Sequence, residues 1–126
     1  MATKKSIILI VEDDELLLRA LYLVFHNSNY TIATAPDGDT GLKMAQRLKP
    51  NIVLLDLLLP KMNGFDFLKY IKADPKLQDI PVIVLSNLGD DDSVTKAKDL
   101  GAIDYFIKAG TDLTELSDRV AKILKV

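Results

Sequence analysis

At 126 residues the chain has room for one domain, which can bury roughly two thirds of the surface that the unfolded chain exposes. Sixteen basic and eighteen acidic residues leave a formal net charge of -2, so the overall charge favours neither nucleic acid nor an anionic membrane as a partner. The absence of cysteine excludes disulfides, thiol catalysis and thiolate metal sites, and it fits a reducing cytosol.

The first half of the chain alternates apolar runs with helical patterns. Ile7–Val11 predicts a strand, too short for a signal sequence or a membrane span, and it stops at four acidic residues that suit the first turn of a helix. Apolar residues then recur at helical spacing to about residue 27. Residues 30–34 alternate in polarity as an edge strand does, and a second helix, with apolar positions 42, 45 and 48, ends before Pro50.

Residues 52–55 are all apolar and predict a short strand buried on both faces of a sheet. A strand of this kind does not carry a lone carboxylate through the sheet, so Asp56 marks its end. An ionised carboxylate beside that much apolar surface costs several kcal/mol unless a cation or hydrogen-bond donors meet it. The partners of Asp56 therefore have to come from elsewhere in the chain.

The second half continues the alternation. A third helix, with apolar positions 65, 68 and 71, ends at Asp74-Pro75. Residues 82–85 predict a fourth strand that closes at Ser86, and residues 103–107 predict a last strand that stops at Lys108. Positions 94, 97 and 100 mark the helix between these strands, and the polar residues ahead of it predict local mobility. The apolar positions of the closing helix are 113, 116, 120 and 123.

Five strands that alternate with five helices predict an α/β fold: a single doubly wound (βα)5 domain with a five-stranded parallel sheet and helices on both faces. All strands then point one way, so their carboxyl ends share one edge of the sheet. Those ends carry Glu12, Asp13, Asp56, Ser86 and Lys108. In open sheets of this kind ligands bind outside the carboxyl ends where the strand order reverses, here between the first and third strands.

The residues at this edge indicate phosphoryl chemistry. Three carboxylates repel one another, which raises at least one pKa unless positive charge lies among them. Magnesium suits Asp13 and Asp56 as ligands, with Glu12 nearby, because it takes few protein oxygens and shares its shell with water and a phosphoryl group. Lys108 adds a fixed positive charge and Ser86 a hydroxyl donor, so together they could neutralise a phosphoryl group on Asp56.

Four motifs, in this order and spacing, resemble those of a known family. They are Val11-Glu12-Asp13-Asp14, Leu54-Leu55-Asp56 with Leu59-Pro60 and Asn63-Gly64 behind it, Pro81–Ser86, and Asp104–Lys108. Together they resemble the receiver domains of bacterial two-component response regulators, of the chemotaxis-regulator type, over essentially the whole chain. The resemblance implies one domain, residues 1–126, with a flavodoxin-like fold and the strand order 2-1-3-4-5.

The resemblance also implies a role for each residue of the site. The metal ligands that it implies are Glu12, Asp13, Asp56 and the backbone carbonyl of Leu58. The residues that it implies for phosphoryl transfer are Asp56, Ser86 and Lys108, and those for the switch are Ser86 and Tyr105.

A chain of this family is expected to be a phosphorylation-activated switch that catalyses only its own phosphorylation and slow dephosphorylation. The resemblance implies that Asp56 accepts the phosphoryl group, with Mg2+, from a sensor histidine kinase or a phosphotransfer protein. The surface around the fourth helix and fifth strand then changes for a downstream protein, and with the fifth helix it is a candidate dimer contact. The expected location is the cytoplasm, without direct nucleic-acid binding or membrane insertion.

Two residues depart from the family pattern, and two others affect the predicted rate of dephosphorylation. Ala109 replaces the proline that usually follows the lysine, which predicts a trans peptide bond and a looser loop. Asn87 replaces a common alanine and narrows the entrance to the site. Leu58 and Leu88 flank the expected path of the hydrolytic water, and because neither can hold water they predict slow self-dephosphorylation. No output domain follows in the sequence, so we expect a free-standing receiver or a domain cut from a longer protein.

Other functions fit the same residues less completely. A degenerate receiver that acts as a constitutive interaction module is one alternative, although every charged or hydroxyl position that the chemistry needs is filled. A magnesium-dependent phosphohydrolase would need a second acid near Asp56 to activate water, and the neighbouring residues are leucines. Asp13 and Asp14 could each be no more than a helix-capping acid. Tyr105 is open between a packing role and a switch.

Overall fold

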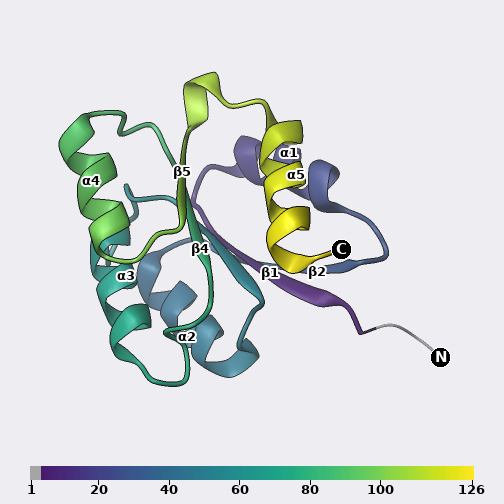
Figure 1. Cartoon of the computed structure of the whole chain (residues 1–126), viewed down its shortest axis with the longest axis horizontal. Coiled ribbons are helices and arrows are strands. Elements are labelled where there is room, and N and C mark those ends of the chain that lie inside the picture. Colours follow the sequence, from purple (N-terminus) through teal and green to yellow (C-terminus); the bar gives the residue numbers. More distant parts are fainter. Residues whose placement is uncertain (1–3) are drawn as a thin grey trace.

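The computed structural model describes residues 4–126, which contain one parallel sheet in the order β2-β1-β3-β4-β5 (Figure 1). The strands are β1 (Ser6–Val11), β2 (Tyr30–Ala35), β3 (Ile52–Leu55), β4 (Val82–Ser86) and β5 (Asp104–Ile107). The helices are α1 (Glu15–Phe25), α2 (Gly38–Leu48), α3 (Gly64–Ala73), α4 (Asp91–Asp99) and α5 (Leu113–Leu124), and a 3-10 turn, η1 (Lys108–Gly110), follows β5. The predicted α/β fold and strand order are confirmed. Residues 1–3 of the expected domain lie outside the described residues.

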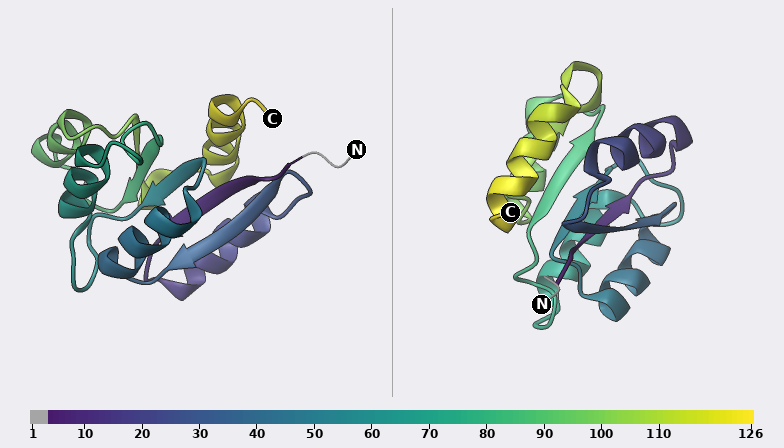
Figure 2. Two further views of the ribbon diagram at one scale, coloured as in Figure 1. Left: turned by 90° about the horizontal axis from the view of Figure 1, so that it is seen from below. Right: turned by 90° about the vertical axis from the view of Figure 1, so that its right-hand side faces the viewer.

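The helices cover the two faces of the sheet in a two-and-three arrangement (Figure 2). Helices α1 and α5 lie on one face, and α2, α3 and α4 lie on the other. Successive strand residues point to opposite faces, so Ile8 and Ile10 pack toward α1 and α5, whereas Leu9 and Val11 pack toward the other three helices. All four side chains are buried, and each such burial contributes about 1.5–3 kcal/mol. Strand β3 is buried at every residue, as predicted.

Some predicted element ends differ from the structure by one residue. Strand β1 begins at Ser6 rather than at Ile7, and β2 ends at Ala35 rather than at Thr34. Strand β5 begins at Asp104 rather than at Ile103, whose side chain is 43% exposed before the strand. Helix α4 ends at Asp99 rather than at Leu100, because the chain turns at Gly101 with a φ of 110°, a value that glycine adopts without strain.

Each of the five α-helices begins behind a residue whose side chain accepts a hydrogen bond from a backbone N–H of the first turn. These N-caps are Asp14, Asp37, Asn63, Asp90 and Asp112. One cap of this kind contributes about 1 kcal/mol to stability. Asp14 accepts from the amides of Leu16 and Leu17 at 3.0 and 3.3 Å, so the alternative left open for this residue is decided in favour of a helix cap.

The outer face of α1 is unusually apolar for a surface helix. Leu16 and Leu23 are 76% and 77% exposed, and Tyr22 between them is 48% exposed. Within residues 4–126, however, no helix combines the length and the apolar character that crossing a bilayer requires.

Candidate functional site

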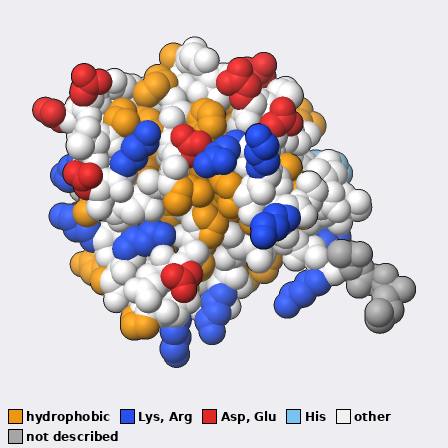
Figure 3. All heavy atoms as spheres, viewed as in Figure 1, with side chains coloured by type: hydrophobic (Ala, Val, Ile, Leu, Met, Phe, Trp, Pro, Cys, Tyr) orange, Lys and Arg blue, Asp and Glu red, His pale blue; other side chains and the backbone are white. Residues whose placement is uncertain are grey.

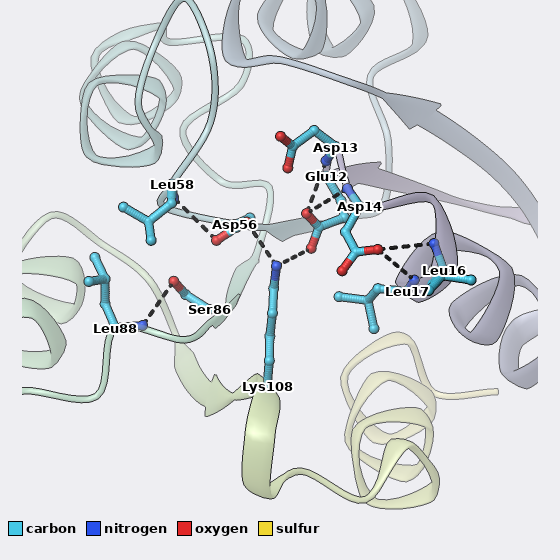
Figure 4. Close-up of polar contacts among 10 residues, drawn as sticks. All are labelled: Glu12, Asp13, Asp14, Leu16, Leu17, Asp56, Leu58, Ser86, Leu88 and Lys108. Atoms are coloured by element: carbon cyan, nitrogen blue, oxygen red, sulfur yellow. Dashed lines mark hydrogen bonds and ion pairs between the residues drawn. The ribbon is translucent and has the colours of Figure 1, made fainter.

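The carboxyl ends of the strands bring the predicted acids together. Val11 is paired with Leu55 in the parallel ladder between β1 and β3, so the residues that follow them, Glu12 and Asp56, leave the sheet side by side. With Asp13, they form a group in which one carboxylate oxygen from each residue lies within 4.8 Å of those of the other two. Figure 4 shows these side chains converging from two strand ends.

Lys108 reaches into this group from the end of β5. Its Nζ lies 2.6 Å from Glu12 Oε1 and 2.9 Å from Asp56 Oδ2, and the three side chains are 15%, 3% and 5% exposed (Figure 4). Burial alone would lower the pKa of Lys108, but its hydrogen bonds to Glu12 and Asp56 outweigh burial and raise this pKa above its ordinary value. The predicted contact between Lys108 and Asp56 is present in the structure.

The bond from Lys108 to Glu12 was not predicted from the sequence, which indicated a role for Glu12 only at the metal. The second oxygen of Glu12, Oε2, accepts the backbone N–H groups of Asp13 and Asp14 at 2.9 and 3.3 Å. Burial raises the pKa of Glu12 to about 7, the charge of Asp56 adds to this rise, and Lys108 opposes it. Both oxygens of Glu12 are therefore engaged, and the residue orients Lys108 and the turn that carries Asp13.

The three carboxylates fit a divalent metal ion by charge and by donor type. When Glu12, Asp13 and Asp56 are ionised, the ammonium of Lys108 balances one of their charges and leaves two, which is the charge of one Mg2+. Carboxylate oxygens are the donors that a hard cation prefers. The carboxyl edge of the sheet thus carries an acidic group able to bind a metal ion, as predicted.

Asp56 and Ser86 are each held by the loop that follows them. Asp56 Oδ1 accepts the backbone N–H of Leu58 at 3.2 Å, and Ser86 Oγ accepts the backbone N–H of Leu88 at 3.3 Å. Ser86 is completely buried, and Figure 4 places its hydroxyl beside Asp56 at the end of β4. No hydrogen bond joins the two side chains among the described residues. The bond from Leu88 uses only an acceptor lone pair of Ser86 Oγ, so the O–H of Ser86 remains available as a donor to a group on Asp56.

Leu88 is also bonded to Tyr105. The phenol O–H donates to the carbonyl of Leu88, so the two predicted switch residues hold the two ends of one residue, Ser86 at its N–H and Tyr105 at its C=O. Burial raises the pKa of Tyr105, with the negative charge of Asp90 as a smaller cause. The ring is partly buried and packs against the cluster that α2, α3 and α4 form with the sheet. Packing and hydrogen bonding coexist at this residue.

The remaining departures from the family pattern lie on the rim of the site. Asn87 and Ala109 are exposed, and the peptide bond before Ala109 is trans, because no cis bond occurs within residues 4–126. Leu58 is 57% exposed, and Leu88 is partly buried. The backbone N–H groups of these two leucines are the donors to Asp56 and Ser86, and both of their side chains are apolar.

A family model described as the response regulator receiver domain matches residues 8–121. The chain belongs to this family. The receiver domain is 34% identical over 118 residues to the DNA-binding dual master transcriptional regulator RpaA of Synechocystis, an alignment that covers 94% of this chain and 48% of RpaA. The chain therefore spans about half the length of that curated relative.

Two solved structures show the same fold with ligands or modifications relevant to the site. The Mn2+-bound form of response regulator Rcp1 is 31% identical with a TM-score of 0.80, and the match covers 94% of this chain and 91% of that one. The phosphorylated cyanobacterial phytochrome response regulator RcpA is 30% identical with a TM-score of 0.81, and the match covers 97% and 93%. The matched family is thus that of response regulator receiver domains, and the curated relative is a transcriptional regulator.

Proposed function

We propose that this receiver domain is a signalling switch that accepts a phosphoryl group on Asp56 in a Mg2+-dependent reaction. The observation that carries the proposal is the buried bridge from Lys108 to Asp56 and Glu12, beside the exposed carboxylate of Asp13. A lysine fixed in this way supplies positive charge at the point where phosphoryl oxygens would lie, without having to be reorganised during the reaction. The donor is a phosphohistidine of a sensor kinase or a phosphotransfer protein.

The residues divide the work as follows. A carboxylate oxygen of Asp56 forms the new bond to phosphorus, while the bond between phosphorus and the histidine nitrogen of the donor breaks. Mg2+ held by Asp13, Asp56 and the backbone carbonyl of Leu58, with Glu12 behind them, would offset negative charge on the phosphoryl oxygens. Lys108 and the hydroxyl of Ser86 donate to the remaining oxygens.

The switch follows from the bonds of Leu88. When Ser86 turns its hydroxyl toward the phosphoryl group, Leu88 loses its bond to Ser86 Oγ while its carbonyl remains held by Tyr105. Movement of this loop is passed to Tyr105 on β5 and to α4, which begins just after the loop. Phosphorylation therefore changes the surface formed by α4 and β5.

That surface suits a protein partner. Figure 3 shows hydrophobic side chains gathered over β4 and β5, between α4 and α5, with lysine and arginine side chains around them. Arg119 of α5 pairs with Asp104 of β5 at 2.9 Å on this face. We assign the face to the downstream target, or to a dimer through α4, β5 and α5.

Intact mass spectrometry tests the proposal directly. The parent and Asp56→Asn are incubated with a small-molecule phosphodonor, with Mg2+ or with a chelator. The parent should gain one phosphoryl mass only with Mg2+, and Asp56→Asn should gain none. A parent that never gains this mass would favour a constitutive interaction module, and equal labelling of both proteins would place the phosphoryl group on another residue.

A further inference from the structure

The loop from Leu57 to Asn63, between β3 and α3, packs against the first residues of α2. A Cβ atom added to Gly38 would lie 2.3 Å from the carbonyl oxygen of Met62 and 2.9 Å from its Cβ. Real Cβ atoms are not found that close to other heavy atoms, so the contact requires glycine at position 38. The backbone of the loop therefore rests directly on the helix.

The neighbouring residues add polar contacts at the same place. Asp37 is 5% exposed and accepts hydrogen bonds from the backbone N–H of Thr40 at 2.7 Å and from its hydroxyl at 3.1 Å. The Nζ of Lys61, on the loop, lies 3.8 Å from Asp37 Oδ2. Lys61 itself has a φ of 66°, a left-handed conformation that a non-glycine residue keeps only where its surroundings enforce it.

The other side of the loop also lacks free space. A Cβ on Gly64 would lie 2.5 Å from the carbonyl oxygen of Asp56 and 2.6 Å from the Cα of Leu57, and the N–H of Gly64 donates to the carbonyl of Leu57 at 2.9 Å. Residues 62–64 are thus confined between α2 and the end of β3. If Met62 is pushed away from α2, the shift has to be taken up by the part of the loop that contains Leu58.

From this geometry we infer that Asp37, Gly38 and Lys61 form a clamp that positions the Leu58 peptide for metal binding and phosphoryl transfer at Asp56. The clamp touches neither the metal nor the phosphoryl group, so its members are positioning residues. The link to the site is already visible in the hydrogen bond from the Leu58 amide to Asp56 Oδ1. The inference rests on the proposed function, in which the carbonyl of Leu58 is a metal ligand.

The decisive variant is Gly38→Ala, with Gly41→Ala as its matched control. Gly41 lies on the same helix, and its added Cβ would meet side-chain atoms of Val11 and Phe67 at 2.9 to 3.3 Å rather than the loop. Both variants disturb packing, but only Gly38→Ala presses on the loop backbone. Gly38→Ala should weaken Mg2+ binding, measured by calorimetry on folded protein, about tenfold, as losses of supporting contacts do in other metal sites. Gly41→Ala should stay within about twofold of the parent.

Amide hydrogen exchange of the metal-free protein gives a second readout that does not depend on phosphorylation. Exchange of the Leu58 amide should be faster in Gly38→Ala than in the parent. It should also be faster, to a smaller extent, in Lys61→Gln, which removes only the ion pair. Lys61→Gln provides the test if Gly38→Ala does not fold. Unchanged Leu58 exchange in Lys61→Gln, or equal Mg2+ affinity in the two glycine variants, would overturn the clamp. If the parent itself takes no phosphoryl group, the proposed function fails, whereas the exchange experiment still decides whether the clamp exists.

Discussion

Replacing Glu12 by glutamine should make the metal-free protein more stable at alkaline pH. Glutamine keeps one oxygen, which can accept from the backbone N–H groups of Asp13 and Asp14, and Lys108 loses its bond to residue 12 but keeps its bond to Asp56. The substitution removes the buried negative charge of Glu12. Burial and the charge of Asp56 raise the pKa of this carboxyl group from 4.5 to about 7, although Lys108 acts to lower it.

The size and the pH range of the effect follow from this pKa. Because the folded-state pKa is raised, the folded protein binds more protons than the unfolded chain between these two values, so the free energy of unfolding of the parent falls as pH rises through that range. The loss is complete above the folded-state pKa and amounts to about 3 kcal/mol at about pH 8, but to less than about 1 kcal/mol at about pH 5. Glu12→Gln should recover this difference.

Urea denaturation in a chelator at several pH values measures the effect, and the same series with Mg2+ is the control. A bound cation favours the charged form of Glu12, so the parent should regain stability with Mg2+ and the advantage of Glu12→Gln should shrink or reverse. An advantage that is equal at both ends of the pH range, or a variant less stable than the parent at alkaline pH without metal, would refute the reasoning, because neither result can come from the charge on Glu12.

Three further outcomes are expected. Asp13→Ala should abolish most Mg2+ affinity, measured by calorimetry. Asp14→Ala should leave this affinity unchanged but lower the free energy of unfolding by about 1 kcal/mol, because a helix cap is lost. Equal Mg2+ affinities and equal stabilities in the two variants would contradict the assignment. Lys108→Ala should fold yet fail to couple phosphorylation to a change around α4, as followed by NMR. A full response in this variant would show that Lys108 is not needed for the coupling. The phosphorylated parent should lose its phosphoryl group more slowly than Leu88→Glu and Leu58→Asn after the donor is removed, and decay as fast as in both variants would exclude water orientation as the limiting factor.

The strands and the polar edge could be predicted because their signals are local, whereas the strand order was implied by the family resemblance. Apolar runs of strand length end at Val11 and Leu55, and the acid that follows each run cannot lie inside a sheet buried on both faces. Once the strands are parallel, Lys108 and the acids necessarily share an edge. The contact between Lys108 and Asp56 also required the family resemblance, because β4 lies between the strands that carry these two residues.

The contacts that could not be predicted depend on side-chain reach or on backbone approaches between distant segments. Nothing in the sequence around Glu12 indicates that Lys108 prefers it at 2.6 Å over a symmetrical position beside Asp56. Glycine is needed at position 38 because the carbonyl of Met62, on another loop, lies against it. The sequence around a glycine at the start of a helix does not indicate which distant residue will contact it. Likewise, the shared role of Leu88 depends on a bond from Tyr105 that only the packed structure defines.

The sheet order has a consequence for folding. Strand β1 pairs with β2 and β3, which come from the first half of the chain, and β4 and β5 are added on the far side of β3. The acids of the site, Glu12 and Asp56, are therefore brought together by strands from the first half of the chain, whereas the cation that they share comes from the end of β5. The charge balance of the site is complete only when both halves of the sheet are joined.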